Sequence, residues 1–427
     1  MTHMAGTSRD MTAERPGGTS PVYGIYGPVN TDAATLSDLL SGGAVIRQIP
    51  VSVLLALESG SSALQDDALD HVAAAGEGLP LTTATCLDDY WNTSLQILND
   101  DIAYRPLAAS RCIAVDKATT YDRLTADGVP VPDYFYGSLS PQLIDNAITA
   151  YGPRPVLKPA TGTSSLGVYR YRDDLSPADN LAYYRILLRM GNVPATSNII
   201  AMRYAGGAEG LEIGAEITMG AGRVISLVVH EKLTSTQVHP FVDRVMVSPP
   251  VHPKIIDALP DLPGHAERIA TALGVVHGVL HAELRLDGGV WQALDIAVRP
   301  GGGLIAHSVQ AITGIDPRVC HILAGLGRPV SDQARNDAAA AYNATCIACC
   351  YTPPARRAQV TFAKQAQVAA DFRGATNVLG WHINAAEVAD ALFEPDAGLS
   401  VGVGAPTPHA ALTRLRALVE PHGYTAA

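Results

Sequence analysis

The feature that most constrains the fold is the segment 281–303, HAELRLDGGVWQALDIAVRPGGG, where two runs of alternating polar and apolar residues flank a pair of glycines. Alternation with a period of two is typical of strands that have one buried face and one polar face. A glycine pair between two such runs predicts a tight turn. The segment is therefore expected to form an antiparallel hairpin that leads directly into a run of glycines.

Two registers fit this hairpin, and they arrange the side chains differently. A two-residue loop pairs Asp287 with Val290 and turns Asp295 away from Glu283. A three-residue loop, a type I turn followed by a left-handed glycine, pairs Leu286 with Val290 and separates polar from apolar side chains cleanly. We expect the three-residue loop, with a polar face that carries His281, Glu283, Arg285, Asp295, Ala297 and Arg299. The apolar face would carry Ala282, Leu284, Leu286, Leu294, Ile296 and Val298.

Two carboxylates, Glu283 and Asp295, are neighbours on the expected polar face and would repel each other. A divalent cation removes this repulsion, and carboxylate oxygens completed by phosphate and water suit Mg²⁺. Arg299 follows on the same face, beside the glycine run, where the backbone can approach a ligand closely. The face is also compatible with a solvated strand pair, in which Arg285 or His281 neutralises Glu283 without a metal ion.

A second candidate site is the segment 158–168, KPATGTSSLGV, which begins at the end of a short apolar strand. Lys158 ends that strand, and a buried lysine is costly unless an anion lies beside it. Small residues follow, and they let several backbone N–H groups converge on phosphate oxygens. They are Thr161, Gly162, Thr163, Ser164, Ser165 and Gly167. The chain contains no GxxxxGK[ST] sequence, which excludes a P-loop, and a glycine-rich hairpin with a surface lysine is the simpler alternative.

Composition and charge exclude several other classes of protein. The chain has 427 residues, enough for two or three compact units, and a formal net charge of −11 without a Lys/Arg cluster, so nucleic acid is not an expected partner. No run of about 18 apolar residues occurs, so no membrane span is expected. Three of the six cysteines (Cys346, Cys349, Cys350) lie in a small-residue stretch that indicates a buried strand rather than a metal or redox site. Reduced thiols fit a cytoplasmic location.

The order of the remaining patterns indicates a mixed fold. After a leader, residues 1–20, that is expected to be disordered, strand-like and helix-like pieces alternate and predict a small parallel α/β unit. A helix is expected to begin at Lys117 and to be capped at Gly128. Antiparallel strand patterns dominate after that, interrupted by a Pro-rich, His-containing loop at 234–253 and by a helix that ends near Gly274. The fold class is therefore α/β together with α+β.

Taken in order, five segments resemble motifs of the ATP-grasp superfamily, specifically of its carboxylate–amine ligases. They are DKATTYDRLTADGVPVP (116–132), VLKPATGTSSLGV (156–168), EIGAEITMGAGRV (212–224), HAELRLDGG (281–289) and LDIAVRPGGG (294–303). The series lies within residues 116–316. The overall length and the long C-terminal part make the L-amino-acid (dipeptide) ligases the most similar group.

The resemblance implies an ATP-grasp fold with an N-terminal Rossmann-like domain, a lid domain and a C-terminal domain. The implied boundaries are 21–112 for the N-terminal domain, 113–203 for the lid and central domain and 204–427 for the C-terminal domain, which would include a subdomain at about 340–427.

The resemblance also implies roles for the matching residues. Nucleotide contacts would come from Lys117 and Lys158 at the ATP phosphates, Ser164, Ser165 and Gly167 in a lid loop, Met202 and Tyr204 at the adenine hinge, and Glu212 at the ribose. Metal and substrate contacts would come from Glu283 and Asp295 at Mg²⁺ or Mn²⁺, Arg299 and Gly302 at the acyl group, and His239 and Arg244 as further substrate contacts. Lys158 and Arg299 would be the catalytic cations.

Three features depart from the family's pattern. Asp295 stands where the family commonly has Glu. Ala297 stands where it commonly has Asn, which leaves the second metal position without that ligand. The hinge reads AMRYAGGAEG (201–210) in place of an acidic pair, so Glu209 is an alternative to Glu212 at the nucleotide.

The implied activity is that of an ATP-dependent carboxylate–amine ligase, which forms an amide or peptide bond through an acyl phosphate and releases ADP and phosphate. An amino acid would be joined to another amino acid or to an amine. Two alternatives are open: a non-catalytic ATP-binding protein, and an ATP-grasp ligase or carboxylase with a non-amino-acid acceptor. The expected partners are small molecules, and the resemblance is compatible with a homodimer.

Overall fold

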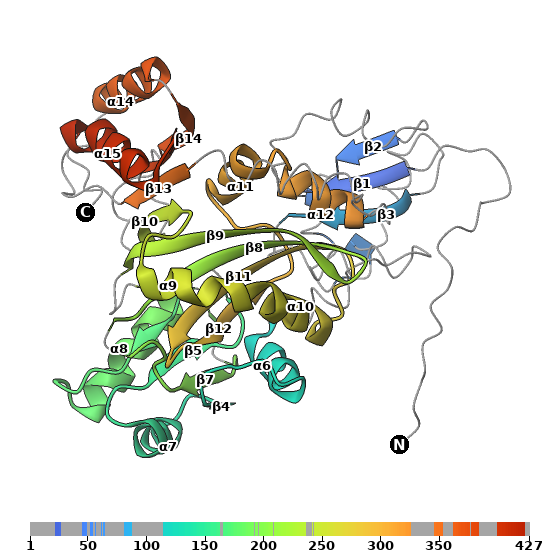
Figure 1. Ribbon diagram of the computed structural model, residues 1–427. Helices are drawn as coiled ribbons and strands as arrows, with labels where there is room; N and C mark the ends of the chain where they lie inside the picture. The colour runs from blue at the N-terminus through green and yellow to red at the C-terminus, as the bar shows by residue number, and fades with distance from the viewer. Residues whose placement is uncertain are drawn as a thin grey trace, which may run out of the picture.

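The structure is a computed structural model whose described part contains three β-sheets (Figure 1). It describes residues 22–26, 45–48, 52–53, 56, 61, 63–64, 81–87, 114–162, 165–191, 193–194, 196–207, 209–235, 241, 243–325, 346–352, 362–375, 377–383 and 399–422. The expected leader, residues 1–20, lies outside these ranges. No helix among the described residues combines the length and the apolar character needed to cross a membrane.

The N-terminal part forms a small parallel sheet with strand order β2-β1-β3. Its strands are β1 (Val22–Tyr26), β2 (Val45–Gln48) and β3 (Leu81–Cys86), and both pairings are parallel. The prediction of a parallel sheet from the alternating patterns is confirmed. In Figure 1 the helix α12 (Pro317–Gly325) lies beside this sheet, so a segment distant in sequence covers it.

A second sheet, here called the lid sheet, contains four antiparallel strands in the order β4-β7-β5-β6. Its strands are β4 (Tyr134–Gly137), β5 (Val156–Pro159), β6 (Tyr169–Arg170) and β7 (Ile199–Met202). The helices α7 (Pro141–Tyr151) and α8 (Pro177–Met190) each begin after a serine whose side chain accepts a backbone N–H, from Leu143 and Asp179 respectively. Apolar residues of both helices pack on the lid sheet and close its core.

The third sheet has eight strands in the order β12-β11-β8-β9-β10-β13-β15-β14, all paired antiparallel. The strands are β8 (Glu212–Gly220), β9 (Arg223–Ser235), β10 (Asp243–Ser248), β11 (Gly278–Asp287), β12 (Val290–Ala297), β13 (Cys346–Thr352), β14 (Val378–Ile383) and β15 (Leu399–Ala405). One face is apolar and carries the largest core cluster. The other face holds the charged side chains described below.

Helices cover the apolar face of this large sheet. They are α6 (Lys117–Ala126), α9 (Pro253–Ala258), the 3-10 helix η2 (Leu259–Asp261) and α10 (Leu262–Ala272). The helix α6 starts and ends where the sequence predicted, with Asp116 as its N-cap and Gly128 just beyond its end at a positive φ of 71°. Buried residues of α6 and α10 join those of β8, β11 and β12 in one core, which fixes the orientation of these strands.

The C-terminal part completes the large sheet. The helices α11 (Ile305–Thr313), α14 (Phe362–Gly374) and α15 (Pro408–Val419) and the 3-10 helix η4 (Glu420–His422) accompany β13, β14 and β15 (Figure 1). Cys349 in β13 is buried, as predicted from its small-residue surroundings. Cys346 and Cys349 are both free thiols.

The predicted loop 234–253 is shorter than expected. The strand β9 runs to Ser235 and β10 begins at Asp243, so the connecting segment is 236–242. Nearby prolines concealed the strand pattern of β10, which pairs with β9 on one side and with β13 on the other. Arg244 therefore lies in a strand rather than in a loop, and its side chain lies outside the described part; His239 lies outside it entirely.

The predicted register of the hairpin is wrong. The turn has two residues, Gly288 and Gly289, with φ of 59° and 83°, and Asp287 pairs with Val290. Positive φ at both central residues is the geometry of a type I′ turn, which matches the twist of the strands. The register then shifts between Glu283 and Leu284.

A β-bulge in β12 explains why Asp295 lies on the predicted polar face although the predicted register is wrong. Leu284 pairs with Ala293, whereas Glu283 pairs with Asp295, so Leu294 is an extra residue on β12. Ala293, not Leu294, is the fully buried residue at this point of the core. The bulge returns Asp295 to the side of Glu283, directly opposite it, which neither simple register predicts.

The turn residues give a test of this register. Gly288→Val is expected to lower the free energy of unfolding by about 1–3 kcal/mol, because a β-branched residue is strained at positive φ. Gly288→Asn is the matched control and should be nearly neutral, because asparagine adopts this conformation and no atom lies within 4 Å of the added Cβ. Denaturant unfolding of both variants measures the difference; equal losses would contradict the type I′ turn.

Candidate active site

A pocket lies between the lid sheet and the polar face of the large sheet, with about 820 Å³ of space that is partly open to solvent. It draws its walls from both sheets and from the start of α6. Eight of the residues predicted from the sequence line it: Lys117, Lys158, Ser165, Met202, Tyr204, Glu212, Glu283 and Asp295. The fold thus gathers in one place residues that the sequence scatters over many elements.

Lys158 reaches the pocket from the lid sheet and is only 6% exposed. Its Nζ donates to the backbone oxygen of Leu294 at 2.6 Å and to the hydroxyl of Tyr121, which itself donates to the same oxygen at 2.5 Å. The bulge leaves Leu294 without a pairing partner on β11, so its carbonyl is free to accept these bonds. Burial lowers the pKa of Lys158 to about 8, so this cation is held at an energetic cost that an anion would offset.

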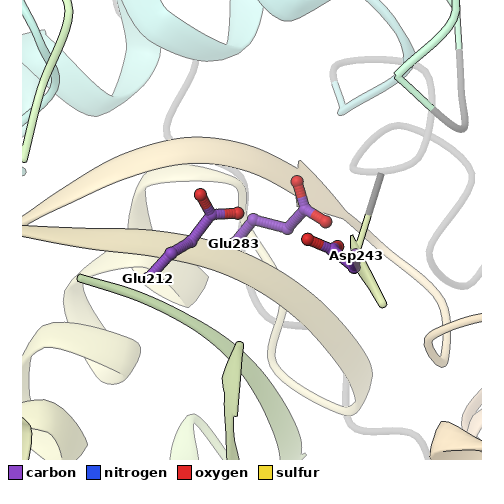
Figure 2. Close-up of side chains that lie close together, drawn as sticks. All are labelled: Glu212, Asp243 and Glu283. Atoms are coloured by element: carbon purple, nitrogen blue, oxygen red, sulfur yellow. The ribbon is translucent and has the colours of Figure 1, made fainter. Parts of the chain in front are cut away.

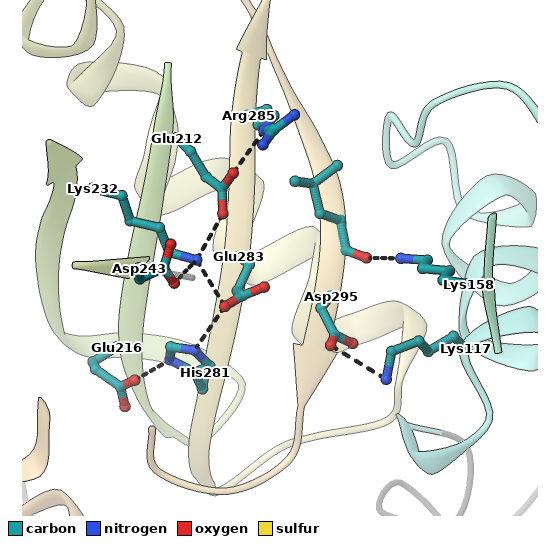
Figure 3. Close-up of polar contacts among 11 residues, drawn as sticks. Lys117, Lys158, Glu212, Glu216, Lys232, Asp243, His281, Glu283, Arg285 and Asp295 are labelled. Atoms are coloured by element: carbon teal, nitrogen blue, oxygen red, sulfur yellow. Dashed lines mark hydrogen bonds and ion pairs between the residues drawn. The ribbon is translucent and has the colours of Figure 1, made fainter. Parts of the chain in front are cut away.

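Lys117 lies at the first position of α6 and points at the same space. Its Nζ donates to the backbone oxygen of Gly162 at 2.7 Å and lies 3.3 Å from Asp295 Oδ2 (Figure 3). The lysine therefore links the small-residue loop after β5 to the polar face of the hairpin. Ser165 in that loop has a positive φ of 56° and lines the pocket, whereas Ser164 lies outside the described residues.

Gly167 lies in the same loop but does not line the pocket. Its φ is 75°, and a Cβ there would lie 3.2 Å from side-chain atoms of Pro159 and Leu188. Glycine at this position therefore lets the loop fold back closely on β5 and α8.

On the opposite wall, Lys232 of β9 is surrounded by three carboxylates. Its Nζ lies 2.7 Å from Glu212, 2.7 Å from Asp243 and 2.8 Å from Glu283, and its side chain is 2% exposed. Figure 2 shows that these three acidic side chains point toward one another from β8, β10 and β11. Burial alone would lower the pKa of Lys232, but Asp243, Glu212 and Glu283 hold it well above its usual range, so the ammonium stays charged.

Glu212 also pairs with Arg285, whose Nε donates to Glu212 Oε2 at 2.6 Å (Figure 3). The guanidinium groups of Arg285 and Arg170 lie 4.8 Å and 3.7 Å from the ring centroid of Tyr204, respectively. Arg285 thus connects Tyr204 with Glu212, and both residues line the same pocket as Met202; the hinge role of Met202 and Tyr204 stays a prediction. The alternative, Glu209, is exposed, pairs with Lys254 at 2.7 Å and does not line this pocket.

His281 and Glu216 form a second charged pair beside Glu283. His281 Nδ1 bonds to Glu216 Oε1, and its Nε2 lies 3.9 Å from Glu283 Oε1. Burial alone would lower the pKa of His281, but Glu216, with a contribution from Glu283, raises it to about 9. Burial alone would raise the pKa of Glu283, but Lys232 and His281 hold it well below its usual range, so it stays ionised.

Arg299 and Gly302 are not among the residues that line the pocket. Arg299 follows the end of β12, and its Nη1 donates to the backbone oxygen of Pro300 at 2.9 Å. Gly302 is exposed, and no atom lies within 4 Å of a Cβ added there. Their predicted substrate contacts therefore stay predictions.

Four residues of this region were missed from the sequence: Tyr121, Glu216, Lys232 and Asp243. Lys232 carries a usable signal, because it is a lysine inside the apolar strand RVISLVVHEKLTS, the same signal that singled out Lys158. Asp243 carries none, because it begins a strand that the sequence did not reveal. Tyr121 and Glu216 look like ordinary helix and strand residues until their partners are known.

The acidic residues fit a divalent cation at one position. Glu283 and Asp295 are register partners on one face and line the same pocket, and carboxylate oxygens are the ligands that Mg²⁺ prefers. Ala297, opposite His281, offers no donor atom for a second ion. Ligand atoms of Glu212, Asp243 and Glu283 lie within 4.8 Å of one another, but the ammonium of Lys232 already lies among them.

The chain has the fold seen in solved ATP-grasp ligases, which confirms the predicted fold class. This rests on solved structures that cover nearly the whole chain. No model of a known protein family matches the sequence, and no curated protein matches it.

Three of these solved structures illustrate the sequence identity, TM-score and coverage of the matches. An L-amino acid ligase from Bacillus licheniformis is 14% identical, with a TM-score of 0.66 over 95% of this chain and 98% of that chain. An N5-carboxyaminoimidazole synthase from Aspergillus clavatus, in complex with ADP and 5-aminoimidazole ribonucleotide, is 15% identical, with a TM-score of 0.66 over 94% and 98%. A phosphoribosylglycinamide synthetase from Anaerococcus prevotii is 12% identical, with a TM-score of 0.57 over 95% and 99%.

The burial of Lys158 predicts a pH dependence of stability. Its pKa is about 8 when folded, below the ordinary 10.5, so between these values the unfolded chain binds a proton that the folded chain has lost. The free energy of unfolding should therefore rise with pH across this window, by a contribution on the order of 1–3 kcal/mol that Lys158→Met removes. Denaturant unfolding at pH 7.5 and pH 10 tests this; identical pH slopes for wild type and variant would contradict it.

Proposed function

We propose that this protein is an ATP-dependent carboxylate–amine ligase that works through an acyl phosphate. The observation that carries the proposal is the placement of Lys117 and Lys158 in one pocket with Glu283 and Asp295. The cations suit phosphate, and the paired carboxylates suit a divalent ion. The fold supports the same conclusion, since the neighbours include ligases solved with ADP and with ATP.

The nucleotide would lie along this pocket. Tyr204 and Met202 at one end would receive the base, with Glu212 near the ribose, although both oxygens of Glu212 already accept bonds, from Lys232 and Arg285. Lys158 and Lys117 would meet the phosphates beneath the loop that contains Ser164, Ser165 and Gly167. A buried ammonium whose pKa is depressed by burial gains stability when an anion arrives, so Lys158 is suited to this role.

Glu283 and Asp295 would hold Mg²⁺, or Mn²⁺, against the phosphates. When bound, the ion would neutralise phosphate charge and polarise the transferred phosphoryl group. Lys232 and His281 keep Glu283 ionised and hold its side chain in place.

The proposed reaction has two steps. A carboxylate oxygen of the first substrate attacks the γ-phosphorus of ATP, and ADP leaves with the electrons of the broken P–O bond. An amine then attacks the carbonyl carbon of the acyl phosphate, phosphate leaves, and the amine nitrogen loses a proton. Because two anions meet in the first step, fixed cations are required, and Lys117 and Lys158 supply them. Arg299 and Gly302 are proposed to bind the acyl group, with His239 and Arg244 as further substrate contacts.

The acyl phosphate must be protected from water. Gly162, in the loop between β5 and β6, accepts a hydrogen bond from Lys117 through its backbone oxygen. We assign to this loop the task of closing the pocket during the reaction. No side-chain nucleophile is needed, so the chemistry requires only positioning and charge.

A second candidate keeps the chemistry and changes the substrates. The N5-carboxyaminoimidazole synthase matches this fold with the same TM-score, 0.66, as the L-amino acid ligase. An ATP-grasp ligase or carboxylase with a non-amino-acid acceptor is therefore the alternative to an amino-acid ligase. A protein that binds ATP without catalysis is the third outcome.

Release of ADP separates these candidates. Purified protein is incubated with ATP, Mg²⁺ and pools of amino acids, and in a separate arm with bicarbonate and amines. Amino-acid-dependent ADP release is expected, and Glu283→Gln should reduce it at least 100-fold because the metal loses a ligand. Glu267→Gln, a helix carboxylate remote from the pocket, is the matched control and should retain full activity. Nucleotide binding without ADP release in any arm would contradict the ligase proposal.

A further inference from the structure

Glu216 is a buried carboxylate to which neither the sequence motifs nor the proposed reaction gives a task. It lies in the middle of β8, is 2% exposed, and pairs in register with His281 on β11. A buried carboxylate is costly unless its oxygens accept hydrogen bonds. The groups that donate hydrogen bonds to Glu216 therefore show which parts of the structure it fixes.

The first partner is the glycine turn that follows β12. The backbone N–H of Gly301 donates to both oxygens of Glu216, at 3.1 and 3.2 Å. A Cβ at Gly301 would lie 2.5 Å from Glu216 Oε1 and 2.8 Å from His281 Nδ1, so any side chain would push the turn off the carboxylate. Close approach, not backbone conformation, is what requires glycine here.

The second partner is the ring of His281. Because Nδ1 donates to Glu216, the ring plane is fixed and Nε2 faces Glu283, 3.9 Å away (Figure 3). His281 also lies opposite Ala297 on β12, the residue that lacks a donor atom. One carboxylate thus holds both the residue beside the proposed metal ligand and the turn that follows Arg299.

We propose that Glu216 is a positioning residue, which locks the turn at Gly301 and the ring of His281 into one rigid unit beside Glu283. This inference rests on the proposed function, because it assigns the unit to the metal and acyl end of that site. His281 and Lys232 both contact the Glu283 carboxylate, so the position of Glu283 depends on them. Residues that orient a ligand in this way commonly change metal affinity or activity by about 10–100-fold when they are lost.

The test measures metal binding without turnover. Mn²⁺ affinity of the complex with a non-hydrolysable ATP analogue is followed by electron paramagnetic resonance in wild type, Glu216→Gln and Gly301→Ala. Both variants should bind Mn²⁺ 10–100-fold more weakly, while affinity for the metal-free analogue stays within twofold of wild type. Glu231→Gln is the matched control: Glu231 is 5% exposed on β9 and accepts from the backbone N–H groups of Val251 and His252, away from the pocket. It should leave Mn²⁺ affinity unchanged.

A proton resonance gives an independent readout. The Nδ1–H of His281, identified by its loss in His281→Asn, should be found downfield of the amides in wild type and disappear in Glu216→Gln. If Glu216→Gln does not fold, Gly301→Ala decides the metal test, since it keeps both side chains. Unchanged Mn²⁺ affinity in the folded variants, or an equal loss in Glu231→Gln, overturns the proposal. If wild type binds no Mn²⁺–nucleotide at all, the proposed function fails, while the imidazole resonance still tests the lock by itself.

Discussion

The ammonium of Lys232 inside a ring of three carboxylates is the interaction on which the polar face of the large sheet depends. Glu212, Asp243 and Glu283 come from three strands and would repel one another without it. Removing one partner of a buried pair leaves an uncompensated charge and typically costs about 3–5 kcal/mol. The same ring sets the charge of the pocket, because it keeps Glu283 ionised and available to a metal ion. Lys232 therefore contributes both to the stability of the fold and to the proposed chemistry.

The β-bulge at Leu294 is the second constraint, and it acts on both walls of the pocket. It brings Asp295 opposite Glu283, and it frees the carbonyl that accepts from Lys158 and Tyr121. A hairpin with the same two-residue turn and no bulge would give neither arrangement, since Asp295 would point into the core. Bulges next to ligand sites commonly re-aim a side chain in this way. The cation wall and the carboxylate wall are thus set by the same extra residue.

Much of the site could be predicted from the sequence because it lies on strands in which polar and apolar residues alternate. Lys158 in β5, the charged face of the hairpin and the ordered motifs together indicated the fold and eight residues that line the pocket. The predicted register was wrong because a bulge and a longer turn leave the same hydrophobic pattern. The sequence pattern therefore does not distinguish between them. Asp243 was missed because its strand is flanked by prolines, and Glu216 because a strand glutamate shows its task only through its partners. The domain boundaries and the contacts of Arg299 stay predictions.

Oxygen transfer from the carboxylate to phosphate tests the central claim, the acyl phosphate, most directly. An amino acid that supports ADP release is labelled with ¹⁸O in its carboxylate, and the released phosphate is examined by mass spectrometry. If the carboxylate attacks the γ-phosphorus, cleavage of the acyl C–O bond leaves one labelled oxygen in each phosphate. Phosphate without label, with the displaced ¹⁸O recovered in water instead, would contradict the account.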